Sequence, residues 1–129
     1  MTPPKILEIT TTAMAFIGDA VYEAYVRQMI LDKGQINADK MHTMSVKYVR
    51  ADGQAKALKA IYNELSEKEI DIVRRARNRR SKSKPKNADP YDYKLATAFE
   101  ALFGYLYLTQ QTPRMEEVFR LAVAAIDEA

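Results

Sequence analysis

The sequence predicts an all-α protein made of one domain. Its 129 residues are 47% hydrophobic and 29% charged, which is typical of a folded domain with its own core rather than of a disordered chain. No run of residues alternates between apolar and polar side chains with the period of two that marks a half-buried strand. Signals for helix starts and helix ends recur along the chain instead. We therefore expect one helical unit over residues 1–129, with a core spanning residues 10–126.

The first half of the chain predicts three helices. The first should cover Thr11–Leu31 and end before Gly34, because glycine readily takes the left-handed conformation that stops a helix. Asn37 is a good N-cap for the second helix. We expect the pair Asp52–Gly53 to break this helix, and a further helix to continue as far as Glu64.

The clearest helix start in the chain lies at Ser66. Ser66 and Glu69 have the spacing of a capping box, in which each side chain satisfies a backbone N–H of the other residue. The helix that follows should run into Arg77 or Arg79. Residues 81–90 are polar and contain two prolines, so we expect a loop there.

Two more helices are expected after this loop. The first is very apolar and should cover Tyr91–Thr109. For the last helix, we expect Thr112 as the N-cap and Pro113 at the first helical position. The longest apolar stretch, Leu95–Leu108, contains one glutamate and is shorter than the roughly 20 residues that a membrane-spanning helix needs.

The composition excludes several kinds of site. The chain has no Cys and one His. Disulfides, thiol catalysis and Cys-ligated zinc or iron–sulfur centres are therefore excluded, and one His cannot form a His-rich metal site. The lack of Cys fits a reducing compartment, and the N-terminus lacks the pattern of a secretory signal. We expect a cytoplasmic protein that does not enter the membrane.

Positive charge is concentrated in one segment. Between Arg74 and Lys86, eight of thirteen residues are basic and none is acidic, whereas the other 12 Lys and Arg are outnumbered by 17 Asp and Glu. Such focusing predicts a polyanionic partner bound at one place. The run contains no aromatic residue, which argues against a platform for stacking single-stranded bases. The alternatives are a solvated loop, or a tail that binds ribosomal RNA without a catalytic role.

Two carboxylates stand alone in apolar helices. Asp19 is the only charge in Ala13–Tyr22, and Glu100 is the only charge in Leu95–Leu108. Both helices are apolar on nearly every face, so we expect both to be largely buried. A buried, unpaired carboxylate costs several kcal/mol, roughly, so each needs a cation, hydrogen-bond donors or a metal ion as a partner.

A glycine accompanies each of these carboxylates. Gly18 precedes Asp19, and Gly104 lies one turn after Glu100 on the same face. Because glycine inside a helix costs ~1 kcal/mol relative to alanine, its usual compensation is the close approach of another backbone. We infer that the two helices cross closely and bring Asp19 and Glu100 together. A hard divalent cation such as Mg²⁺ would remove the repulsion between them; alternatively, each acid pairs separately with Arg or Lys in the core.

Two further polar residues are weaker candidates. Glu23 lies one turn after Asp19, but its spacing also suits an ion pair with Arg27. His42 lies among apolar residues, so we expect a packed or hydrogen-bonded histidine rather than a ligand.

Three segments together resemble the ribonuclease III family. FIGDAVYEAYVR (Phe16–Arg27) is similar to the family signature, in which a Gly–Asp pair lies in an apolar helix. TAFEALFGYLYL (Thr97–Leu108) is similar to the second acidic motif of the fold. RRARNRRSKSKPKN (Arg74–Asn87) resembles the basic connection of the Mini-III branch, which lacks the double-stranded RNA-binding domain. The resemblance spans residues 10–126, so no separate RNA-binding domain is expected.

The resemblance implies an all-helical, homodimeric, Mg²⁺-dependent endoribonuclease that acts on double-stranded RNA. In bacteria this branch matures the ends of 23S rRNA from its precursor, with a large-subunit ribosomal protein thought to assist. Asp19 aligns with the essential catalytic aspartate, and Glu100 with the glutamate that helps to hold the metal. We expect RNA contacts from the basic and amide side chains of the charged segment: Arg74, Arg77, Asn78, Arg79, Arg80, Lys82, Lys84, Lys86 and Asn87.

The sequence departs from full-length ribonuclease III at two positions. Ala15 stands where those enzymes carry a further glutamate, and Thr97 where they carry a further acid. The Mini-III branch shows the same reduction. Two protein carboxylates can hold one Mg²⁺ with waters and an RNA phosphate, whereas a second ion would depend mostly on the RNA.

The apolar content of two helices predicts a homodimer. Six large side chains cannot all face one core from two helices: Phe16, Val21, Tyr25, Phe99, Phe103 and Tyr107. Large exposed apolar patches normally mark interfaces. The competing interpretation of the whole chain is a non-catalytic helical RNA-binding or ribosome-assembly protein on the same fold, against which the intact Asp19 and Glu100 argue.

Overall fold

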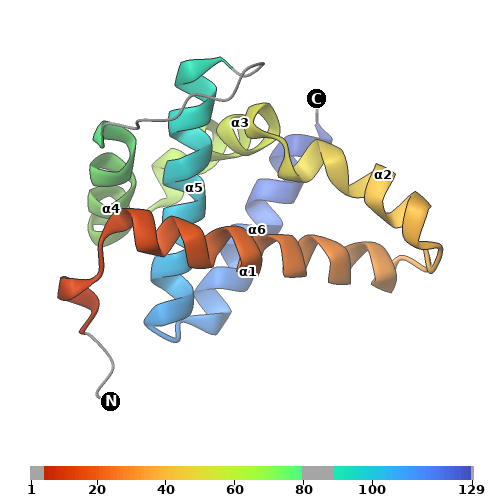
Figure 1. Cartoon of the computed structure of the whole chain (residues 1–129), viewed down its shortest axis with the longest axis horizontal. Coiled ribbons are helices and arrows are strands. Elements are labelled where there is room, and N and C mark those ends of the chain that lie inside the picture. Colours follow the sequence, from red (N-terminus) through yellow and green to blue (C-terminus); the bar gives the residue numbers. More distant parts are fainter. Residues whose placement is uncertain (1–4, 80–88, 129) are drawn as a thin grey trace.

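The described residues of the protein fold into a set of packed helices (Figure 1). The structure is a computed structural model of the chain and describes residues 5–79 and 89–128. No strand occurs in these described ranges, which confirms the predicted all-α class. The elements are a 3₁₀ turn η1 (Ile6–Glu8), α1 (Thr11–Asp32), α2 (Ala38–Val49), α3 (Ala51–Ile61), a 3₁₀ turn η2 (Tyr62–Glu64), α4 (Glu67–Asn78), α5 (Pro90–Leu108) and α6 (Thr112–Asp127).

Helix α5 is the centre of the fold. It contacts α1, α3, α4 and α6, and it crosses behind α1 in the view of Figure 1. Nine of its residues are buried, among them Phe99 and Phe103, because its apolar side chains cover nearly every face. The ring of Tyr22 on α1 packs edge-on against both phenylalanines. The expectation that this helix is largely buried is therefore confirmed.

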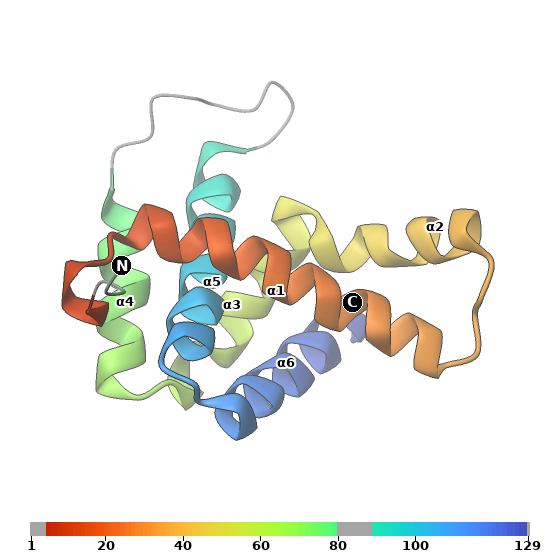
Figure 2. The same cartoon turned by 60° about the horizontal axis from the view of Figure 1, so that its bottom comes forward.

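The C-terminal half of α1 and helix α2 form an arm that extends to one side (Figure 2). The reversal between them uses Gly34, whose φ of 99° suits glycine alone. Asn37 caps α2 as predicted, since its side chain accepts a hydrogen bond from the Lys40 amide at 3.0 Å. The Tyr22 hydroxyl donates to the backbone carbonyl of Tyr48 at 2.8 Å, which ties the arm to the core.

The break between the second and third helices lies earlier than predicted. Helix α2 ends at Val49 and α3 begins at Ala51, so Asp52 and Gly53 belong to the first turn of α3. A Cβ at Gly53 would stand 2.2 Å from the backbone oxygen of Lys47. The glycine is there because the two helices meet backbone to backbone at this corner, not because the helix stops.

The start of the last helix also differs from the prediction. Helix α6 begins at Thr112, with Gln111 as its N-cap and Pro113 at the second helical position. After the end of helix α5, Gln110 has a left-handed φ of 58°. This conformation is usually found at glycine, so the sequence did not predict it at this position. The Gln111 amide then bonds to the Leu106 carbonyl at 2.9 Å, so the chain reverses at once and α6 starts early.

The capping box of α4 is present and has a second function. Ser66 and Glu69 exchange the predicted hydrogen bonds, at 2.9 and 3.2 Å. Arg114 of α6 donates two hydrogen bonds to the Glu69 carboxylate, at 2.7 and 2.9 Å. Burial acts to raise the pKa of Glu69, but these donors outweigh it and hold the pKa below its usual value. This ion pair thus joins α4 to α6.

Helix α1 is buried on one face only, which corrects the expectation that it is largely buried. Met14, Gly18, Tyr22 and Val26 face the core, whereas Phe16 is 79% exposed. The reason is that α5 and its neighbours cover only one side of α1. No helix in the described part of the chain is long and apolar enough to cross a membrane.

Candidate active site

Two glycines set the geometry of the site where α1 crosses α5. A Cβ placed on Gly18 would stand 1.7 Å from the backbone oxygen of Glu100, and one on Gly104 would stand 1.8 Å from that of Met14. No side chain fits between the helices at either point, so their backbones touch. The predicted close crossing is confirmed.

The crossing brings the two lone carboxyl groups together. Asp19 follows Gly18 on α1, and its carboxyl lies near enough to that of Glu100 on α5 to raise the pKa of Glu100. Glu100 is half-buried, whereas Asp19 is exposed, which corrects the expectation that both are buried. Successive helix residues are rotated by about 100°, so the residue after an inward-facing glycine points towards solvent. Within the described ranges, neither acid forms an ion pair with Arg or Lys, so the alternative of separate ion pairs finds no support there.

Glu100 has an unusual titration because of this neighbourhood. Burial, followed by the proximity and negative charge of Asp19, raises the pKa of Glu100 to about 8. The negative charge of Glu23 acts in the same direction. In the absence of a cation, Glu100 therefore keeps its proton to a higher pH than an ordinary glutamate does.

Gln54 is a site residue that sequence reasoning missed. Its side chain is 2% exposed, and its amide nitrogen donates to the Val49 carbonyl at 3.4 Å. The same side chain lies near Glu100 and acts to lower the pKa of that carboxyl. Gln54 is therefore a buried polar neighbour of Glu100 that comes from a third helix, α3. No sequence signal distinguishes Gln54, because Asp52, Lys56 and Lys59 lie on the same helix and an amide among them is typical of a surface position.

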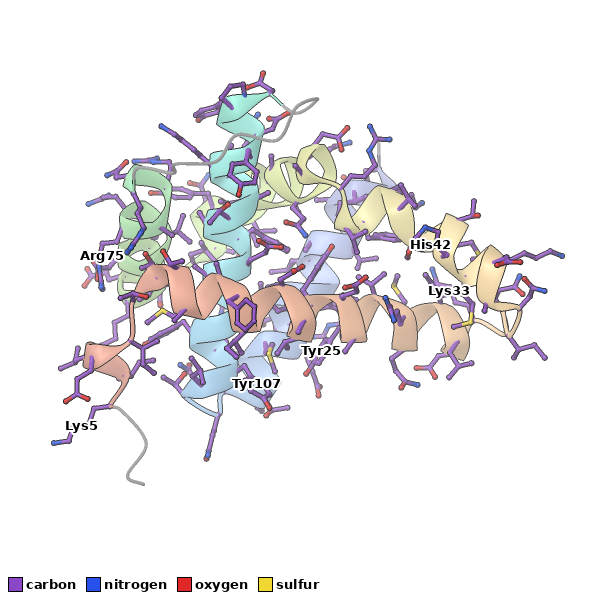
Figure 3. The ribbon with its side chains drawn as sticks, in the orientation of Figure 1. Lys5, Tyr25, Lys33, His42, Arg75 and Tyr107 are labelled. Carbon is purple, nitrogen blue, oxygen red and sulfur yellow. The ribbon has the colours of Figure 1, made fainter. Side chains whose placement is uncertain are left out.

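The remaining candidates divide clearly. Glu23 pairs with Arg27 at 2.9 Å, as its spacing predicted, and still lies near enough to Glu100 to affect its pKa. His42 is exposed on α2, so the expectation of a packed histidine is wrong (Figure 3). Ala15 is buried in the core, and the Thr97 hydroxyl donates to the Tyr93 carbonyl at 3.0 Å, so neither position adds a carboxylate.

The acid pair fits a hard divalent cation as part of a ligand set. Its donors are all oxygens, which a hard cation prefers, and burial together with neighbouring Asp19 raises the pKa of Glu100, a cost that a bound cation would offset. Within residues 5–79 and 89–128, no three His, Asp or Glu side chains converge on one point. The protein thus offers two carboxylates, and other ligands would complete the shell of an ion.

The basic segment begins on the last turns of α4. Arg74 and Asn78 are exposed, Arg77 is half-buried, and Arg79 is the C-cap of the helix. The other five predicted RNA contacts lie outside the described residues: Arg80, Lys82, Lys84, Lys86 and Asn87. The structure therefore places only the helical part of this segment.

Comparisons with known proteins agree with this geometry. The Ribonuclease III domain family matches residues 12–111, which contain both carboxylates and the crossing. Two similar proteins are named Mini-ribonuclease 3. The one from Thermoanaerobacter is 43% identical, and the alignment covers 99% of this chain and 90% of that protein. The one from Symbiobacterium thermophilum is 41% identical, and the alignment covers 94% of this chain and 93% of that protein. A crystal structure of a Fusobacterium nucleatum protein superimposes with a TM-score of 0.84 at 29% identity, covering 95% of this chain and 99% of that one.

The fold and the family match define a ribonuclease III domain, and hence an endoribonuclease of the type that acts on double-stranded RNA. Within this class, the chain belongs to the Mini-ribonuclease 3 family.

Proposed function

We propose that this endoribonuclease hydrolyses double-stranded RNA with Mg²⁺ held by Asp19 and Glu100. The observation that carries the proposal is the proximity of the two carboxyls at the glycine crossing. When bound there, Mg²⁺ would lower the pKa of a water ligand and stabilise negative charge on the phosphate oxygens.

The residues around the pair have separate tasks in this proposal. The buried side chain of Gln54 acts to lower the pKa of Glu100 and so favours the ionised carboxylate that a cation needs. The exposed Asp19 is the group that the RNA backbone reaches first. Glu100 must lose its proton before it can bind a cation, so its raised pKa makes cation binding compete with protonation.

The substrate we propose is the precursor of 23S rRNA, cut in its double-stranded ends in the cytoplasm during ribosome biogenesis. The duplex is read by shape and phosphate contacts, because the deep major groove of RNA excludes side chains. Basic residues at the end of α4 suit such contacts, since Arg74 and Arg79 are exposed there. A large-subunit ribosomal protein that shapes the precursor is part of the proposal.

We also propose a homodimer, with one acid pair in each subunit. Phe16 is 79% exposed and Tyr107 is 51% exposed. Next to them, residues of α1 and α5 line a groove of about 700 Å³ that includes Ala20, Ala24 and Leu108. Figure 3 shows Tyr25 and Tyr107 on this side of the molecule. A two-fold axis would let Phe16 of each subunit enter the groove of the other.

Charge-only substitutions test the catalytic proposal. Asp19→Asn and Glu100→Gln keep the size of each side chain but remove one ligand charge. We expect each to lower the cleavage rate of duplex RNA by at least about 100-fold, because even outer-sphere partners of metals contribute 10–100-fold. Binding of the duplex in EDTA should not change, since the basic residues are intact.

The matched control is Glu116→Gln, the same change at an exposed position of α6, and it should cleave normally. Wild-type cleavage should stop in EDTA and return with Mg²⁺. Wild-type protein that binds duplex RNA but never cuts it would support the non-catalytic alternative. Normal cleavage by either site variant would remove that residue from the mechanism.

A further inference from the structure

A second groove lies between the C-terminal half of α4 and the N-terminal end of α1. Its volume is about 500 Å³, and it is lined by Thr10, Thr11, Arg74, Arg75, Asn78 and Arg79. Three of these six residues carry a guanidinium group and none is acidic. Figure 3 shows Arg75 on α4 beside the start of α1.

Thr11 is a nearly buried polar residue in the lining of this groove. Thr11 is 6% exposed, and its side chain has no hydrogen bond within the described ranges. In the same ranges, every side-chain oxygen or nitrogen that is sealed from solvent has a partner. The hydroxyl must therefore keep access to solvent, and the groove that Thr11 lines supplies it.

The backbone adds two more donors at this point. The side chain of Thr10 caps the helix by accepting from the Ala13 amide at 3.1 Å. The amides of Thr11 and Thr12, in the first turn, have no carbonyl to bond within the helix. The N-terminus of this 22-residue helix also carries partial positive charge.

The arginines of the groove are available to an anion. Arg75 pairs with Asp71 at 3.4 Å, but both side chains are more than half exposed, so water screens the pair. Arg74 and Arg79 form no ion pair in the described part of the chain. Guanidinium groups suit phosphate, because their planar N–H groups match two phosphate oxygens at once.

We propose that this groove binds a single phosphate group of the RNA, held by the Thr11 hydroxyl, the first-turn amides of α1 and the guanidinium groups of α4. The nature of the ligand rests on the proposed function. Thr11 lies eight residues before Asp19 on one unbroken helix, a rise of about 12 Å. A phosphate held at this end of α1 therefore places the RNA strand at a fixed distance from the acid pair.

Inorganic phosphate is the probe for the site itself. We expect it to shift the backbone amide NMR signals of Thr11, Thr12 and Asn78 saturably, whereas chloride should not. In the double variant Thr11→Val/Arg75→Gln, this affinity should fall by about 10-fold. The matched control Arg120→Gln removes an exposed arginine of α6 and should behave as wild type. Equal shifts in the wild type and the double variant would overturn the proposal, provided that the remaining signals show an intact fold.

Two RNA duplexes distinguish the source of the phosphate. They share one sequence and differ in a 5′-hydroxyl or a 5′-phosphate, and binding is measured in EDTA so that no cleavage occurs. If the groove holds an internal phosphodiester, the double variant should bind both duplexes about 10-fold more weakly, and the slope of log affinity against log salt should fall in magnitude by about 1. If the groove holds a terminal phosphate, the double variant should bind only the phosphorylated duplex more weakly. Unchanged binding of both duplexes would refute the site for RNA, and a protein that binds phosphate here but never cuts RNA would refute the proposed function alone.

Discussion

Glu100 and Asp19 differ in their surroundings although they share one site. Glu100 is half-buried and its pKa is raised by burial and by neighbouring Asp19, whereas Asp19 is exposed to solvent. Their difference follows from the crossing, because the backbone of Glu100 lies directly against Gly18. The core therefore fixes the position of Glu100, whereas Asp19 lies on the solvent side, from which a substrate would approach.

The stability of the metal-free protein should depend on the protonation of Glu100. Its pKa is raised from 4.5 to about 8 in the folded protein, so the stabilising effect of the proton is complete below pH 4.5 and is lost as the pH rises through about 8. In EDTA, the free energy of unfolding in urea should be lower at about pH 9 than at about pH 5, and Glu100→Gln should flatten this slope. Adding Mg²⁺ should flatten it in the wild type, because a cation favours the ionised carboxyl.

The control for this measurement is Glu116→Gln, an exposed carboxyl on α6, which should keep the wild-type slope. An unchanged pH dependence in Glu100→Gln would show that other groups carry the slope.

At the scale of elements, the contact between α1 and α5 is the central joint of the fold. Nine residues of α5 are buried, and the helix touches four others. The joint places the site, because both acids lie within one turn of a glycine that touches the opposite backbone. Loosening this joint would separate the acids before it unfolded the rest.

Gly104→Ala should therefore affect both stability and activity. Its Cβ would stand 1.8 Å from the Met14 carbonyl oxygen, and both groups are backbone, so the helices must move apart. We expect the free energy of unfolding to fall by about 3 kcal/mol or more, with loss of cleavage below the melting temperature. Ala60→Ser adds one atom to an exposed position of α3 and should change stability by less than about 0.5 kcal/mol. Wild-type stability in Gly104→Ala would mean that the helices do not touch in solution.

At the scale of the whole molecule, the outer face of α1 remains uncovered. Ala13, Phe16, Ala20 and Ala24 are exposed along one stripe of this helix, beside the groove formed with α5. Helix α1 therefore has two roles: one face packs on α5, and the other is left for a second subunit in the proposed dimer.

Phe16→Asp should dissociate this dimer. A charge at the centre of an apolar interface loses its hydration without gaining a partner, so light scattering should report a monomer at concentrations where the wild type is a dimer. The fold should persist, because the side chain is 79% exposed within one subunit. The exposed Ile36, outside the groove, is the control position, and Ile36→Asp should remain dimeric. A monomeric wild type that cleaves duplex RNA would exclude the dimer from the mechanism.

Local patterns in the sequence were enough to predict the helices and the meeting of the two acids. A glycine inside an apolar helix has one common reason, a close helix crossing, so Gly18 and Gly104 predicted the joint next to Asp19 and Glu100. Capping residues such as Asn37 and Ser66 act within a few residues, and their helix starts were predicted correctly.

Only the tertiary structure decided which side chains cover which others. The exposure of Asp19, the proximity of Gln54 to Glu100 and the groove at Thr11 join residues from different helices. The left-handed Gln110 and the early break at Arg50 likewise depend on how neighbouring helices pack. Periodicity along one helix indicates which residues share a face. The angle and position at which a second helix meets that face depend on the whole core. That packing decides which polar groups are buried, paired or left open to a ligand.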